Sequence, residues 1–265
     1  MKARLTTQAT AVVALLGTAL ALGCDNGSDV TSPGGAPVLL AVTRASGDLA
    51  TRVPAFAASI GAVDNKGAAG RHDATGRRAI NWDGVPAQLT NVDTFPAKFF
   101  NANSARGLEY LTATGTGLEV SDNGFAGINP SYATDLVAFS APKLFTPIGT
   151  NRAEFRFRIP GTDTAAVVQS FGAVVVDVDK PNTTRLQAYD KDDHLIADVP
   201  VPVRADPDEY SLIGVQFDRP AIARIVMTLG DTPIGAGVND VSSGGTKDLV
   251  VLDDFLYSEP QPEAQ

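Results

Sequence analysis

Two adjacent carboxylates, Asp253 and Asp254, interrupt an apolar run over Leu249–Tyr257 near the end of the chain. The run consists mainly of aliphatic and aromatic residues, which predicts a central β-strand. Side chains alternate along a strand, so we expect the two carboxylates to point to opposite faces and one of them to enter the core. Because an unpartnered buried carboxylate is strongly destabilising, that aspartate should be ion-paired, hydrogen-bonded or bound to a metal.

Calcium is the metal that these residues favour, since Ca²⁺ binds about six to eight oxygens from carboxylates, amides and backbone carbonyls. Two further pairs could complete the site: Asn81 with Asp83, and Asp177 with Asp179, which share one face of their predicted strand. The alternative is that one carboxylate of the Asp pair bonds to an arginine and the other faces water; the candidate arginines are Arg77, Arg78 and Arg224. The sequence leaves both interpretations open.

Trp82, the only tryptophan, lies between Asn81 and Asp83. It could be a platform on which a sugar ring stacks, which requires an exposed indole, or a partly buried anchor where the first strand meets the sheet. Trp82 is therefore a candidate ligand-binding residue with a structural alternative.

Other charged motifs have simpler explanations. The run Asp190-Lys191-Asp192-Asp193 lacks the glycine of a calcium loop and is more typical of a hairpin turn. Arg156 and Arg158 alternate with apolar residues on one strand. This alternation favours a solvated outer face over a groove for an acidic ligand.

Catalysis has little support in the sequence. His72 and His194, the only histidines, have no nearby serine in a nucleophile-elbow context, and no HExxH motif occurs. Glutamate, the usual acid or base of glycosidases, is scarce, with 6 residues against 24 aspartates. We therefore expect a protein that is not an enzyme. The alternative is an extracytoplasmic polysaccharide hydrolase whose carboxylate pair the sequence does not single out.

Charge and composition restrict the class of partner. The 265 residues carry a formal net charge of −9. This acidity argues against nucleic acid as a partner, because nucleic-acid binding requires basic patches. Hydrophobic residues make up 44% of the chain, which is enough for a substantial core, and the 25 glycines and 17 prolines favour turns over helices.

The N-terminus has the pattern of an export signal. Lys2 and Arg4 precede an apolar segment, Ala11–Gly23, which is too short to span a bilayer stably. The stretch Leu20-Ala21-Leu22-Gly23-Cys24 resembles the lipobox of bacterial lipoproteins, in which the cysteine is lipidated. We expect residues 1–23 to be a signal peptide, Cys24 to carry a lipid in the membrane of the cell envelope, and residues 24–37 to be a flexible tether. Ordinary secretion into the periplasm or medium is the alternative.

From Arg77 onward, short apolar segments are divided by turn residues, which predicts an all-β, antiparallel, jelly-roll-like β-sandwich over residues 77–258. Arg152–Ile159 is the clearest strand, and Leu108–Thr112 and Leu118–Ser121 are expected to pair as a hairpin. Residues 38–76 should be an N-terminal extension and a mobile Gly-rich loop, in which Pro54 leaves Leu49–Ile60 open between helix and extended chain. Residues 259–265 should be a disordered tail.

Three blocks also carry a family resemblance: Gly76–Pro86 (GRRAINWDGVP), Phe171–Asp179 (FGAVVVDVD), and Val251–Tyr257 (VLDDFLY) with the preceding Ala223-Arg224-Ile225-Val226. Together they resemble uncharacterised bacterial secreted and surface β-sandwich proteins, whose relatives often carry PEP-CTERM-type sorting signals. The resemblance covers Gly76–Pro260 and implies no activity. We expect the N-terminal lipid to take the place of such a signal in this chain.

The Asp253–Asp254 pair is also loosely similar to the last strand of jelly-roll carbohydrate-binding modules, in which an aspartate helps to hold a structural calcium ion. This resemblance implies carbohydrate as a ligand and calcium as a bound ion. We therefore expect a non-catalytic, lipid-anchored β-sandwich of the cell envelope that binds carbohydrate or another extracellular ligand, or that has a structural role.

Overall fold

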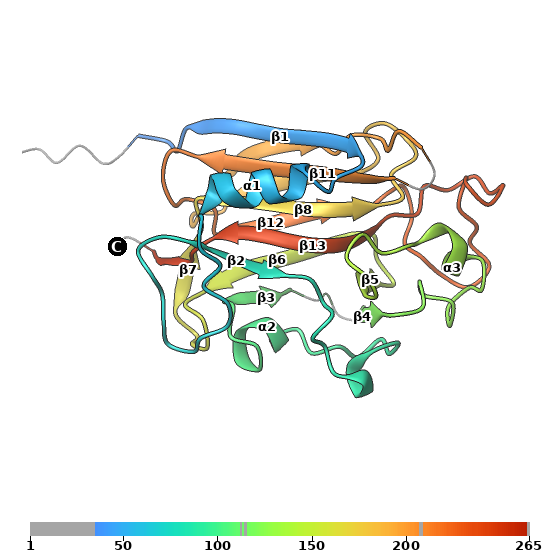
Figure 1. The fold of residues 1–265 in the computed structure, drawn as a ribbon, viewed down its shortest axis with the longest axis horizontal. Helices are drawn as coiled ribbons and strands as arrows, with labels where there is room; N and C mark the ends of the chain where they lie inside the picture. The colour runs from blue at the N-terminus through green and yellow to red at the C-terminus, as the bar shows by residue number, and fades with distance from the viewer. Residues whose placement is uncertain (1–34, 112, 114–115, 207–208, 264–265) are drawn as a thin grey trace, which may run out of the picture. The chain divides into compact units, whose positions relative to one another are not determined.

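The computed structural model describes residues 35–111, 113, 116–206 and 209–263. The described residues of the unit that begins at Ala36 are nearly all β, and two antiparallel sheets form a β-sandwich (Figure 1). This confirms the fold class expected from the sequence. The predicted signal peptide, Cys24 and residues 24–34 of the predicted tether lie outside the described residues.

The first sheet, sheet A, has the strand order β1-β11-β8-β13-β5-β4, and β2 also pairs with β13. Every pairing in it is antiparallel. Its strands are β1 (Leu39–Gly47), β2 (Arg77–Ile80), β4 (Gly117–Ser121), β5 (Leu144–Ile148), β8 (Ser170–Val176), β11 (Tyr210–Phe217) and β13 (Val251–Ser258).

The second sheet, sheet B, has the order β10-β9-β12-β6-β7-β14, and β3 pairs with β6. Its strands are β3 (Leu108–Tyr110), β6 (Arg152–Arg158), β7 (Ala165–Val167), β9 (Arg185–Tyr189), β10 (Leu195–Pro200), β12 (Arg224–Thr228) and β14 (Gln261–Pro262). The chain crosses between the sheets several times: β8 and β11 lie in sheet A, the hairpin β9–β10 and β12 lie in sheet B, and β13 returns to sheet A.

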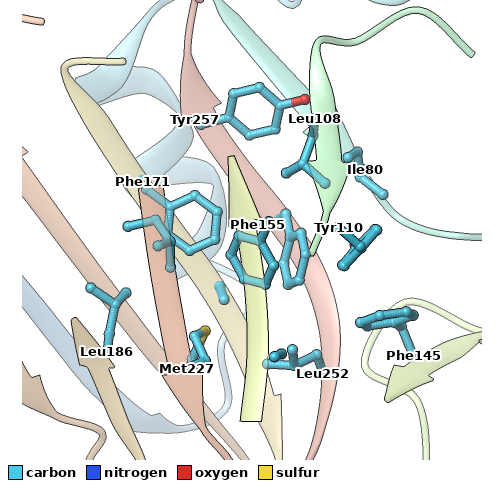
Figure 2. Packing of buried hydrophobic residues seen from close by; sticks show 14 of the residues in the cluster. Ile80, Leu108, Tyr110, Phe145, Phe155, Phe171, Leu186, Met227, Leu252 and Tyr257 are labelled. Atoms are coloured by element: carbon cyan, nitrogen blue, oxygen red, sulfur yellow. The ribbon is translucent and has the colours of Figure 1, made fainter. Parts of the chain in front are cut away.

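The core between the sheets follows from the alternation of side chains. In β6, Phe155 and Phe157 are buried while the arginines between and beside them are half-buried or exposed. Phe155 packs against Phe171 of sheet A with ring centroids 5.4 Å apart (Figure 2). Strand β8 is buried along its whole length because both of its faces are covered. Strand β8 is therefore a central strand of sheet A, between β11 and β13.

Helix α1 (Arg52–Ile60) covers part of the outer face of sheet A (Figure 1). Phe56 lies directly on two glycines of the sheet: a Cβ atom at Gly172 or Gly214 would come within 2.3 Å or 2.5 Å of its ring. Pro54 occupies the first helical turn, where a missing backbone N–H breaks no hydrogen bond. The segment that the sequence left open is therefore a helix.

The remaining helices are short: η1 (Ala87–Leu89), α2 (Phe99–Ala102) and α3 (Tyr132–Asp135). Among the described residues, none of the helices combines the length and the apolar character that a membrane span requires.

The predicted hairpin of Leu108–Thr112 with Leu118–Ser121 is wrong. Strand β3 pairs with β6 in sheet B, whereas β4 pairs with β5 in sheet A. The predicted hairpin across Asp190–His194 is confirmed as β9–β10.

The described part of the predicted C-terminal tail is ordered, which differs from the expectation. Glu259 is 3% exposed and forms a buried ion pair with Arg78, and Gln261–Pro262 forms β14 against β7. Glu259 also accepts hydrogen bonds from Asn65 and from the backbone N–H of Asp73, at 2.9 and 3.2 Å. The segment after β13 therefore bonds to the Gly-rich loop, whose mobility stays a prediction.

Candidate metal centre

A β-bulge in β13 decides where Asp253 and Asp254 point. The pairing with β8 shifts between Leu252 and Phe255, so that the two aspartates oppose one residue of the partner strand. Leu252 and Phe255 both face the core between the sheets, while Leu256 belongs to the cluster beneath α1. The Ser140 hydroxyl lies 2.9 Å from Asp253 Oδ1 and 2.7 Å from Asp254 Oδ1. Both carboxylates therefore lie on the outer side of sheet A, and the prediction of opposite faces is wrong.

The carboxylate of Asp253 is fully buried but well supplied with donors. Its Oδ2 accepts hydrogen bonds from the backbone N–H groups of Phe139 and Ser140, at 2.7 and 3.2 Å, and its Oδ1 accepts from the Ser140 hydroxyl. Burial and the neighbouring charge of Asp254 raise the pKa of Asp253 to about 8. Burial also raises the pKa of Asp254. This pair binds the segment Phe139–Ser140 to the sheet.

Trp82 supports the bulge from the core side. Its indole N–H donates to the carbonyl of Asp253 at 2.7 Å, and its ring stacks on Phe145 with centroids 4.4 Å apart. The side chain is only 1% exposed. A stacked sugar requires an exposed indole, so the ligand-binding role of Trp82 is wrong and the anchor role is correct.

Asn81 and Asp83 lie in the same region as the Asp pair. The Asn81 amide donates to Asp83 Oδ2 at 2.8 Å, and the charge of Asp83 contributes to the raised pKa of Asp254. Burial raises the pKa of Asp83 itself. Asp83 is thus close enough to affect Asp254, but the oxygens of Asp83, Asp253 and Asp254 do not all lie within 4.8 Å of one another in the described chain. Calcium at this place stays a prediction. Two of the arginines suggested for this pair bond elsewhere, Arg78 to Glu259 and Arg224 to Glu154 and Asp193.

Asp177 and Asp179 form a separate centre just beyond the end of β8. They lie after the strand rather than on it, and Asp177 adopts a left-handed backbone with φ of 71°. The turn brings both carboxylates toward Asp240, which the sequence did not single out. One oxygen of each of the three side chains lies within 4.8 Å of the others.

Arg204 occupies one side of this centre. Its Nη1 lies 2.5 Å from Asp177 Oδ1, and its Nε donates to Asp179 Oδ1 at 2.7 Å. The other oxygens, Asp177 Oδ2 and Asp179 Oδ2, are buried and accept no hydrogen bond from any residue that the structure describes. A carboxylate oxygen of this kind needs a partner, which can be a proton, a water molecule or a metal ion.

Asp240 reaches the centre from the loop between β12 and β13. Its Oδ1 accepts the backbone N–H of Leu249 at 2.8 Å, and its Oδ2 accepts the N–H and hydroxyl of Ser242, both at 2.7 Å. The loop is closed so tightly that a Cβ atom at Gly245 would lie 2.0 Å from the carbonyl of Asn239. The sequence showed only a long polar loop here, since this closure depends on tertiary contacts.

The electrostatics of the centre follow from its charges. Burial and the charges of Asp240, Asp179 and Asp135 raise the pKa of Asp177 to about 9, against the opposing effect of Arg204. Burial also raises the pKa of Asp240. Three carboxylates face one guanidinium, so the fully ionised centre would carry excess negative charge in a region removed from water.

Asp190, Asp192 and His194 are the second group whose ligand atoms lie within 4.8 Å of one another in the described chain. Here Asp190 Oδ1 accepts the backbone N–H groups of Asp192 and His194, both at 2.9 Å, and Asp192 and His194 are exposed. These bonds are those of an aspartate-stabilised turn. The predicted hairpin turn accounts for this group.

No protein-family model matches the chain, and no curated protein matches it. Among solved structures, the chain is similar to the enzymatically active domain of tailspike protein 4 of bacteriophage CBA120, with 10% sequence identity and a TM-score of 0.24. The alignment covers 68% of this chain and 22% of that chain. A likeness at this TM-score carries no argument about function.

Proposed function

We propose that this protein is a non-catalytic β-sandwich of the cell envelope, held there by a lipid on Cys24, which binds calcium through Asp177, Asp179 and Asp240 and has carbohydrate as its extracellular ligand. The observation that carries the calcium site is the buried Asp177 side chain. It is 0% exposed, and its Oδ2 accepts no hydrogen bond from the described residues while two more carboxylates face it.

Calcium fits this centre better than a further protein cation does. Ca²⁺ prefers carboxylate and carbonyl oxygens and tolerates irregular coordination. Arg204 already bonds to one oxygen of Asp177 and one of Asp179, which leaves the second oxygen of each for an ion. A divalent ion would neutralise the excess charge that Arg204 alone does not balance.

The role of the ion would be structural. Asp177 and Asp179 follow β8, whereas Asp240 belongs to the loop that leads to β13 and bonds to the N–H of Leu249. An ion between them would join this loop to the end of the central strand. Its binding energy would then stabilise the folded chain, because the three ligands are brought together only by folding.

Location and ligand are supported by sequence features. The lipobox-like stretch before Cys24 supports export and a lipid anchor, and the net charge of −9 opposes binding to nucleic acid. Carbohydrate is supported by the resemblance to carbohydrate-binding modules and by a polar pocket described in the next subsection.

Thermal unfolding of the full chain with calcium or with EDTA tests the calcium centre. Calcium modules outside the cell bind with dissociation constants of about 0.1–1 mM, so about 10 mM calcium should saturate the site. Stabilisation of about 1.4–2.7 kcal/mol is expected, which would raise the melting temperature by about 3–10 °C. Asp177→Asn and Asp240→Asn should abolish this rise.

The matched control is Asp192→Asn, because Asp192 belongs to the exposed acidic group of the β9–β10 turn. This variant should keep the full response to calcium. An unchanged melting temperature of the wild-type chain in calcium and EDTA would contradict the proposed centre, as would a normal response in Asp177→Asn.

A further inference from the structure

The outer face of sheet A changes from apolar to polar where α1 ends. Beneath the helix this face presents Gly172, Gly214 and Leu256 to Phe56 and its neighbours. Two residues further along each strand, the same face presents Ser170, Gln216 and Ser258. Ser170 and Gln216 are direct partners in the β8–β11 pairing.

A pocket of about 380 Å³ lies over this polar row. Its polar lining comes from Ser59 of α1, Thr75, Gln169, Ser170, Gln216, Ser258, Glu259 and Gln261. The volume lies in the range of pockets that hold small organic molecules, which is about 300–1,000 Å³.

Ser170 is the least satisfied polar group of the pocket. The residue is 1% exposed, yet its hydroxyl has no hydrogen-bond partner among the described residues. Its backbone N–H donates to the Ser258 hydroxyl at 3.1 Å. A buried hydroxyl without a partner is unfavourable, and a ligand in the pocket would supply the missing bond.

Two glutamines of the lining use their amide donors on backbone carbonyls of the protein. The Gln169 amide donates to the carbonyl of Phe217 at 2.9 Å, and the Gln261 amide donates to the carbonyl of Asp73 at 2.7 Å. The last turn of α1 also lines the pocket, where the carbonyl of Ser59 accepts a hydrogen bond from Gln216 Nε2 at 3.5 Å. A carbonyl oxygen has two lone pairs, so it can accept a second bond. The lining therefore offers neutral acceptors.

Charge does not govern this pocket. Glu259, the carboxylate in its lining, is bonded through both oxygens to Arg78, so the charges of this pair compensate each other. Ile60, Ala58 and Pro220 add an apolar wall. A neutral ligand with several hydroxyl donors and one apolar face has the matching chemistry.

We infer that this pocket at the end of α1 binds one residue of a neutral sugar, and this inference rests on the carbohydrate ligand of the proposed function. The hydroxyl groups of the sugar donate to the glutamine oxygens and the helix-end carbonyls and accept from Ser170. Its ring C–H groups lie against Ile60 and Pro220. No aromatic platform is required, which agrees with the burial of Trp82.

Saturation-transfer NMR on the full chain tests the site with glucose, galactose, mannose and N-acetylglucosamine, and with glucuronic acid as the charged comparison. At least one neutral sugar should show transfer, with a dissociation constant in the millimolar range. Glucuronic acid should bind at least about tenfold more weakly, because none of the described residues that line the pocket is a lysine or arginine. Absence of transfer to all four neutral sugars would overturn the inference.

Paired variants of α1 locate the binding. Ala58 and Ala55 are both exposed on the helix, but Ala58 lines the pocket and Ala55 does not. Ala58→Phe should block binding, whereas Ala55→Phe should bind as the wild type does. Ser170→Ala should weaken binding by about tenfold through the loss of one hydrogen bond, and its folding should not suffer because no protein partner is lost.

The outcomes separate this inference from the proposed function. Sugar binding that survives in Ala58→Phe would keep carbohydrate as the ligand but overturn this pocket. Binding that is lost in Ala58→Phe while calcium has no effect on melting would support the pocket and contradict the calcium centre.

Discussion

Two buried acidic regions of sheet A use similar residues in different ways. At the β13 bulge, the carboxylate of Asp253 is met by two backbone N–H groups and one hydroxyl. Beyond the end of β8, Asp177 is met by a guanidinium on one oxygen and by no described donor on the other. Burial raises the pKa of both aspartates, so burial alone does not distinguish the two regions.

The distinction lies in what each carboxylate leaves unsatisfied. Neutral donors from Phe139 and Ser140 bond to Asp253 and so hold this loop segment to the sheet. Both carboxylate oxygens of Asp253 have a hydrogen-bond partner. At Asp177 and Asp179, two oxygens without donors face a third carboxylate. The first arrangement holds protein segments together, whereas the second has the donor set and charge that a cation requires.

The largest effect is expected for Arg204→Gln, which removes the guanidinium that pairs with Asp177 and Asp179. Breaking a buried ion pair costs about 3–5 kcal/mol, so the variant should be much less stable than the wild type in EDTA. Saturating calcium should recover at least half of this loss, because the ion can neutralise carboxylates that Arg204 no longer pairs. Urea unfolding in calcium and in EDTA measures both quantities.

The control for Arg204→Gln is Arg185→Gln. Arg185 forms a half-exposed pair with Asp198 at 2.8 Å, and pairs of that kind contribute about 0–1 kcal/mol. The small loss of stability in Arg185→Gln should be equal in calcium and in EDTA. If calcium fails to reduce the difference in unfolding free energy between Arg204→Gln and the wild type, the centre is an ion-pair network and not a metal site.

The next effect concerns the β13 bulge. Asp253→Ala should destabilise the chain by about 3 kcal/mol, because the N–H groups of Phe139 and Ser140 would be buried without acceptors. The loss should be the same in calcium and in EDTA, as measured by urea unfolding followed by circular dichroism.

Asp254→Ala should cost less than Asp253→Ala, since Asp254 is half-buried and its recorded partner is the Ser140 hydroxyl. A loss of stability in Asp253→Ala that occurs only in calcium would reverse the roles assigned to the β13 bulge and the Asp177 centre. It would show that the Asp pair is the metal site, as the sequence predicted.

The two regions also show what sequence patterns can predict. The apolar run Leu249–Tyr257 and the alternation in Arg152–Ile159 identified β13 and β6, because strand periodicity is local. The bulge in β13 is a shift in the register of its pairing with β8, and no local sequence pattern predicts it. One extra residue reversed the side of Asp254, and with it the expected chemistry of the pair.

Long-range contacts explain the other differences. Asp240 reaches Asp177 only because its loop folds back on the end of β8, and Glu259 is buried only because Arg78 lies opposite it. Strands β3 and β4 are close in sequence, but their partners β6 and β5 lie in different sheets. The pairing of two strands depends on partners elsewhere in the chain, which turn residues between them do not reveal.

The smallest effect concerns Glu119, a third buried acid that belongs to neither region. It measures how much the burial of an ionised carboxylate destabilises this chain. Glu119 in β4 is 6% exposed, and burial together with the charge of Asp93 raises its pKa from 4.5 to about 7. The folded chain therefore binds more protons than the unfolded chain between pH 4.5 and 7, and stability should fall as the pH rises through that window. Glu119→Gln should remove this fall and be more stable than the wild type at pH 8 by at most about 3 kcal/mol, with little difference at pH 4.

Urea unfolding from pH 4 to 8 measures this effect, and Asp93→Asn provides a graded variant. Removing the charge of Asp93 takes away one cause of the raised pKa of Glu119, so the fall in stability should end at a lower pH than in the wild type. Destabilisation by Glu119→Gln at pH 8 would mean that the ionised side chain is favourably bound. The extent of burial would then not indicate how much an ionised carboxylate destabilises the other two acidic regions. The contrast between those regions would rest on their hydrogen-bond partners alone.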